Sequence, residues 1–135
     1  MNIDVTGAAI PRLTRRDIAE FSRKVLLSLH LDEEISDLSI AFVDDDTMRN
    51  LNRQFRHKNK TTDVLTFPAD ETSGGEIIIC VDQARRQAAD EKHSLATEVR
   101  YLILHGILHA LGYDHETDNG EMNALELKTR KVVGL

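Results

Sequence analysis

Stretches in which apolar residues recur every three or four positions alternate along this chain with short stretches that are apolar almost throughout. The first pattern predicts amphipathic helices, and residues 14–30 are an example, in which Thr14 and Asp17 form a capping pair at the start. The same spacing predicts four more helices. One is capped by an aspartate at 44–46 and bears Met48, Leu51 and Phe55 on one face, and the next covers residues 82–92. A further helix follows Ser94 and bears Leu95, Val99, Leu102 and Ile103, and the last starts at Asp118 and turns Met122, Leu125 and Val132 to the core.

The short apolar stretches predict strands, because each is too brief for a helix and is bounded by turn residues. They cover residues 3–5, 38–43, 62–67 and 76–81. Four short strands with four or five helices indicate an α/β (α+β) fold, in which helices cover a small mixed four-stranded sheet. The length of 135 residues and the hydrophobic content of 41% favour one domain over residues 1–135.

Charge is distributed unevenly along the chain. The formal net charge of -6 argues against a protein that coats nucleic acid through bulk positive charge. Residues 49–60 nevertheless contain no acidic residue and follow directly on the acidic triplet at 44–46. The sequence therefore predicts a local basic surface on an acidic protein, formed by Arg49, Arg53, Arg56, Lys58 and Lys60.

The compartment is predicted from the N-terminus and from the single cysteine. The first ten residues carry no basic residue ahead of an apolar stretch, and no apolar stretch reaches the roughly 20 residues that span a bilayer. We therefore expect a cytoplasmic protein that is not exported. Cys80 cannot form an internal disulfide, which is compatible with a reducing compartment, and its apolar neighbours predict a buried core thiol.

Three of the six histidines fall within residues 105–115, in the segment HGILHALGYDH. His105 and His109 are four residues apart, so a helix places their imidazoles on one face, one turn apart. Gly112 stands where this helix has to end, because glycine adopts a left-handed conformation without a Cβ penalty, and the reversal turns His115 back toward the same point. Three nitrogen donors with a fourth position left to water are typical of catalytic zinc, so we expect one zinc ion per chain.

The surroundings of the first two histidines also favour a metal. The rest of their helix is apolar nearly all round, which predicts that it is largely buried. A buried imidazole needs partners for its nitrogens, and a shared ion supplies them together. The alternative is a pair of core histidines bonded to neighbours such as Glu98, seven residues before His105.

The spacing matches the metzincin peptidase pattern HExxHxxGxxH at both helical histidines, the glycine and the third histidine. Where those peptidases carry the glutamate that acts as general base, this chain has Gly106. Peptide hydrolysis by that route is therefore not expected. We interpret the missing side chain at Gly106 as room for a ribose-phosphate close to the ion.

Three segments carry a family resemblance: HGILHALGYDH, NRQFRHKNKTTDVLTFP from Asn52 to Pro68, and GEIIICVD from Gly75. Together they resemble the YbeY family of bacterial endoribonucleases, over about residues 38–115. The resemblance implies a zinc-dependent, single-strand-specific endoribonuclease that acts in 3′ end maturation of small-subunit (16S) ribosomal RNA and in ribosome quality control. It implies His105, His109 and His115 as the metal ligands.

The resemblance also maps the functionally important arginine of the family to Arg56. A guanidinium holds a phosphate through two hydrogen bonds and stabilises charge that develops on a scissile phosphodiester. Asp114, beside the third predicted ligand, is a candidate proton relay or a turn residue. Glu76 stands where the family often has aspartate.

The expected partners are single-stranded RNA, ribosomal RNA and components of the small ribosomal subunit, without DNA or a membrane. Two alternatives stay open at this point. One is a metal-dependent peptidase or another hydrolase that uses the same ion. The other is a zinc-stabilised module that binds ribosomal components without cutting RNA.

Overall fold

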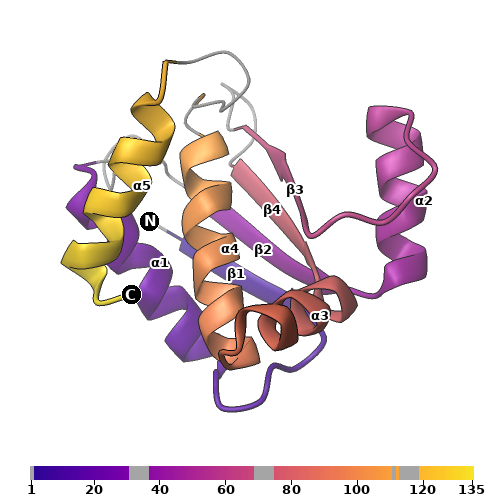
Figure 1. Cartoon of the computed structure of the whole chain (residues 1–135), viewed down its shortest axis with the longest axis horizontal. Coiled ribbons are helices and arrows are strands. Elements are labelled where there is room, and N and C mark those ends of the chain that lie inside the picture. The colour runs from indigo at the N-terminus through magenta and orange to yellow at the C-terminus, as the bar shows by residue number, and fades with distance from the viewer. Residues whose placement is uncertain (1, 31–36, 69–74, 111, 113–118) are drawn as a thin grey trace.

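The computed structural model describes residues 2–30, 37–68, 75–110, 112 and 119–135 (Figure 1). Its elements follow the predicted order: β1 (Asn2–Gly7), α1 (Arg15–Ser28), β2 (Asp37–Val43), α2 (Asp45–Arg56), β3 (Val64–Phe67), β4 (Gly75–Cys80), α3 (Val81–Glu91), α4 (Leu95–Ala110) and α5 (Glu121–Val133). The strands form one four-stranded sheet in the order β1-β2-β4-β3. β1, β2 and β4 run parallel and β3 pairs antiparallel with β4, so the predicted small mixed sheet is confirmed.

The two faces of the sheet carry hydrophobic clusters of unequal size. Along β2 and β4, side chains alternate between the faces, as the pleat of a strand requires. Ile40 and Ile77 belong to the larger cluster, which α1, α4 and α5 cover. Ile78 and Cys80 belong to a smaller cluster on the other face, which includes Met48 of α2. Figure 1 shows α1, α4 and α5 gathered together, with α2 standing apart from them across the sheet.

The helix starts follow the predicted capping chemistry. The Thr14 hydroxyl accepts a hydrogen bond from the Asp17 amide at 3.0 Å, and the Asp17 carboxylate accepts one from the Thr14 amide at 3.0 Å. Asp44 is the aspartate that caps α2, and its carboxylate accepts from the Thr47 amide at 2.8 Å. The predicted start of the last helix at Asp118 lies outside the described residues, and α5 is described from Glu121.

The prediction of Val132 as a core residue is wrong, because it is 58% exposed. Phe55, on the apolar face predicted for α2, is 49% exposed. α2 covers a narrow strip of sheet, and of its apolar side chains only Met48 is fully buried there. The buried face of α5 runs instead through Met122, Glu126, Thr129 and Val133.

α4 packs tightly against the sheet at Gly106. The helix is buried over most of its length, as its apolar sequence predicted. A Cβ built on Gly106 would lie 2.9 Å from Cγ2 of Ile77 in β4, closer than real Cβ atoms approach a neighbour. The glycine therefore sets how closely α4 packs on β4. None of the described helices combines the length and the apolar character needed to cross a membrane.

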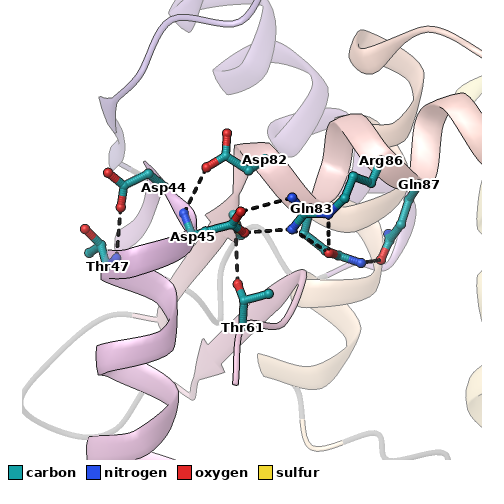
Figure 2. A network of polar contacts seen from close by, with 9 residues as sticks. Asp44, Asp45, Thr47, Thr61, Asp82, Gln83, Arg86 and Gln87 are labelled. Carbon is teal, nitrogen blue, oxygen red and sulfur yellow. Dashed lines mark hydrogen bonds and ion pairs between the residues drawn. The ribbon is translucent and has the colours of Figure 1, made fainter. Parts of the chain in front are cut away.

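A polar network fastens the start of α2 to the neighbouring elements. The Asp45 carboxylate accepts hydrogen bonds from both terminal nitrogens of Arg86, at 3.0 and 2.7 Å, and the Asp82 carboxylate accepts from the Asp45 amide at 2.9 Å. Figure 2 shows these side chains turned toward one another where α2 begins beside α3. The Cys80 thiol lies beneath them, 3.3 Å from the Asp45 carboxylate. Burial raises the pKa of this thiol, which is fully buried as predicted.

The Gly106 contact predicts that Gly106→Ala lowers the free energy of unfolding by about 1–3 kcal/mol, although alanine is the better helix former. The added methyl group has to displace Ile77 or move the helix. Denaturant unfolding of Gly106→Ala, Ile77→Ala and the double variant tests this. The cost of Gly106→Ala should shrink in the Ile77→Ala background, and an unchanged cost would contradict the contact.

The network predicts an acid-sensitive contribution to stability. Hydrogen bonds from Arg86 lower the pKa of Asp45 from its ordinary value of 3.8 to about 2. Because the pKa is lower in the folded state, this contribution is complete above about pH 4 and is lost as the pH falls toward about 2. In Arg86→Gln, NMR titration should place the pKa of Asp45 near its ordinary value, whereas Arg85→Gln, one residue away on α3, should leave it near the parent's. An Asp45 pKa that stays low without Arg86 would disprove the assignment.

Candidate metal centre

His105 and His109 meet at the surface edge of α4. Their Nε2 atoms lie 2.9 Å apart, and their ring centroids are 4.5 Å apart at an interplanar angle of 69°. Both side chains are half-buried, whereas the residues between them are buried. The expectation that the two imidazoles share one face of a helix is confirmed.

The two ring nitrogens lie within hydrogen-bond distance of each other and could become ligands of one metal ion. Nitrogen ligands that each lie about 2.1 Å from one tetrahedral zinc ion are about 3.4 Å apart. The pair at 2.9 Å therefore has to open only slightly to accept an ion between its Nε2 atoms. His115, the third predicted ligand, and Asp114 lie outside the described residues.

The end of the helix has the conformation that the sequence predicted. Gly112 has a φ of 92°, in the left-handed region that favours glycine. Its amide donates a hydrogen bond to the carbonyl of His109 at 3.0 Å. The helix thus ends at Ala110, one residue after the second histidine.

A buried carboxylate from another helix meets the opposite edge of the His105 ring. Oε1 of Glu126, in α5, lies 3.5 Å from Nδ1 of His105 and 3.5 Å from Nη2 of Arg130. The Arg130 guanidinium lies over the Tyr101 ring, 4.4 Å from its centroid. Sequence reasoning missed Glu126, although a glutamate four residues after Met122 shares the buried face of a helix.

Glu98 was named above as a partner of the histidines in the alternative to a metal site, but its described contacts are with other residues. Its carboxylate lies 2.7 Å from Nε2 of His93 and accepts a hydrogen bond from the Gln87 amide at 2.9 Å. Glu98 therefore belongs to a separate pair, which joins α4 to the end of α3. The neighbouring carboxylate of His105 is Glu126.

A cavity of about 510 Å³ lies beside His105. Its walls include five carboxylates: Asp63, Asp90, Glu91, Glu98 and Glu126. Negative charge on this side disfavours the approach of a polyanion. A polyanionic ligand is therefore expected to reach the histidine pair from another direction.

Gly106 does not have the role that the sequence suggested. It is buried, and the position that a Cβ would occupy is directed at Ile77 of β4. The interpretation of this glycine as space for a ribose-phosphate is therefore wrong. Its missing side chain allows the helix to pack on the sheet.

Arg56 is the last residue of α2, and its side chain is exposed. His57 follows in a left-handed conformation with a φ of 57° and ends the helix. The buried amide of Asn52 donates a hydrogen bond to the carbonyl of Lys60 at 2.9 Å, which ties the segment after Arg56 back to α2. Among the described contacts, Arg56 makes no hydrogen bond or ion pair with His105 or His109.

The other predicted basic residues are exposed as well: Arg49, Arg53, Lys58 and Lys60. Phe55 lies among them and packs edge-on against Phe67 of β3, with 5.2 Å between the ring centroids. β3 in turn packs against α4. The basic segment is thus connected to the helix of the histidine pair through one strand.

A second group of metal-binding residue types lies at the start of α2. Ligand atoms of Asp45, Cys80 and Asp82 lie within 4.8 Å of one another and could hold a metal ion. Each of them already has a structural contact: Asp45 pairs with Arg86, Cys80 bonds to Asp45, and Asp82 binds the first amide of α2. A cation would have to displace these contacts, so the histidine pair is the better candidate.

Comparison with known proteins places this fold among one group of enzymes. The family model described as endoribonuclease YbeY matches residues 5–134. An endoribonuclease YbeY from Nautilia profundicola is 48% identical over 102 residues, which cover 73% of this chain and 73% of that protein. Another, from Solibacter usitatus, is 38% identical over 135 residues, which cover 97% of this chain and 88% of that protein.

A solved structure agrees with these matches. The solution structure of TM1509 from Thermotoga maritima superposes with a TM-score of 0.68 at 28% sequence identity, covering 97% of this chain and 88% of that one. The α+β fold and the family match extend over nearly the whole chain. This chain therefore belongs to the YbeY family of endoribonucleases.

Proposed function

We propose that this chain is a zinc-dependent endoribonuclease that cleaves single-stranded RNA in the cytoplasm. Its biological role would be 3′ end maturation of 16S ribosomal RNA and ribosome quality control, in contact with components of the small subunit. The observation that carries the proposal is the convergence of two imidazole nitrogens, 2.9 Å apart, in a member of an endoribonuclease family.

The metal ligands in this proposal are His105, His109 and His115, from one domain spanning residues 1–135. Zinc bound there would supply Lewis-acid chemistry for the hydrolysis of a phosphodiester. His105 and His109 present their Nε2 atoms together, which supports their place in the ligand set. Gly106 leaves the site without the glutamate that serves the metzincin peptidases as general base.

The substrate in this proposal follows the basic segment, residues 49–60. Arg56 holds a phosphate and stabilises the charge that develops on it. Exposed arginines and lysines beside it attract the RNA backbone. The half-exposed ring of Phe55, fixed against Phe67, offers an unpaired base a face on which to stack, which supports a preference for single strands.

Highly purified protein is expected to contain one zinc per chain and to cut a defined single-stranded RNA. His109→Ala should lose both the zinc and the cleavage, because it removes one of the ligands. Elemental analysis and an RNA cleavage assay on the same preparations measure the two quantities.

Cleavage by a trace ribonuclease contaminant would persist in His109→Ala, so this variant also serves as the control for contamination. Stoichiometric zinc in a His105→Ala, His115→Ala double variant would refute the ligand set. Chelator-sensitive proteolysis by the parent that His109→Ala abolishes would point to a peptidase instead.

Arg56→Ala is expected to lower RNA cleavage about 100-fold or more while leaving zinc content and folding nearly unchanged. The arginine is proposed to touch the substrate rather than the metal. Arg56→Lys should restore activity only in part, since lysine lacks the planar fork. Arg85→Ala, an exposed arginine on α3, serves as the control. Parental activity in Arg56→Ala would remove the residue from the mechanism.

A further inference from the structure

We propose that Glu126 is the positioning residue of the metal centre. Its carboxylate lies beside Nδ1 of His105 and favours a proton on that nitrogen, which leaves the lone pair of Nε2 for the ion. This inference rests on the proposed zinc site and adds to it a residue from α5. It concerns how the first ligand is held, and Glu126 itself does not touch the metal.

The contact geometry selects which nitrogen of His105 binds. Nδ1 lies 3.5 Å from Oε1 of Glu126, whereas Nε2 lies 2.9 Å from Nε2 of His109. A neutral imidazole carries one N–H and one lone pair, so a carboxylate beside Nδ1 favours the tautomer that has its proton there. Nε2 is then the acceptor, and it is the atom that faces the partner ligand. Histidine ligands of metals commonly have a carboxylate in this position.

Glu126 is held at this edge of the ring by its surroundings. The residue is only 7% exposed and lies on the buried face of α5. A buried carboxylate is costly unless cations or hydrogen-bond donors surround it. Arg130, one turn later, provides a charge at 3.5 Å and is itself placed over the Tyr101 ring. The carboxylate is thus fixed between a guanidinium and the ring that it orients.

Helix α4, which carries His105, provides a matched comparison in Glu98. Glu98 is also 7% exposed and also pairs with a histidine, His93, at 2.7 Å. His93 is not among the proposed ligands. Glu98→Gln and Glu126→Gln therefore remove the same charge at the same degree of burial, and only Glu126→Gln removes it from a ligand.

The test measures zinc affinity by chelator competition in the parent, Glu126→Gln and Glu98→Gln, with thermal unfolding to verify that each is folded. Glu126→Gln should bind zinc about 10- to 100-fold more weakly, because an amide no longer dictates which nitrogen is protonated. Glu98→Gln should match the parent. Equal zinc affinity of Glu126→Gln and the parent, or an equal loss in both variants, would overturn the assignment.

A second measurement is independent of metal binding and of folding in the variants. Proton–nitrogen NMR of the metal-free parent, at alkaline pH where imidazoles are neutral, should show the proton of His105 on Nδ1. A proton on Nε2 would refute the role of Glu126 whatever the zinc result. If the parent binds no zinc, the proposed function and this inference both fail, whereas zinc binding with the proton of His105 on Nε2 overturns this inference alone.

Discussion

The packing of α4 on the sheet is the constraint on which the rest of the structure depends. Gly106 brings the helix against Ile77 of β4, and apolar residues bury most of its surface. The two histidines are only half-buried, so their imidazoles reach solvent although most of the helix around them is buried. The packed backbone of α4 holds the two Nε2 atoms close together, so little further conformational entropy is lost when they bind one ion.

Charge divides the surroundings of this pair into two sides. On one side a cavity is walled by carboxylates, and one of them, Glu126, approaches the His105 ring. Beyond β3, α2 ends in exposed arginines, and the segment that follows it carries exposed lysines. Such a division steers a polyanion along one path and away from the other, even though the net charge of the protein is negative.

Sequence reasoning recovered the elements and the local part of the site, because both depend on short-range spacing. His105 and His109 are one helical turn apart, so their meeting follows from the helix alone. Glu126 reaches His105 only after α5 has packed on α4, and periodicity within one helix does not predict such a contact. The orientation of Gly106 was misjudged for a related reason, since the spacing of residues does not say which face of an all-round apolar helix meets the sheet.

The unequal clusters on the two faces of the sheet give the molecule unequal local stability. The larger cluster joins α1, α4 and α5 to one face, whereas α2 rests on a few side chains and is fastened at its start by Asp45 and Arg86. Regions with few buried apolar contacts open at a lower free-energy cost than the core. The end of α2 that carries Arg56, held mainly by the contact of Phe55 with Phe67, is therefore expected to open more readily than α4, whose packed backbone keeps the spacing of His105 and His109.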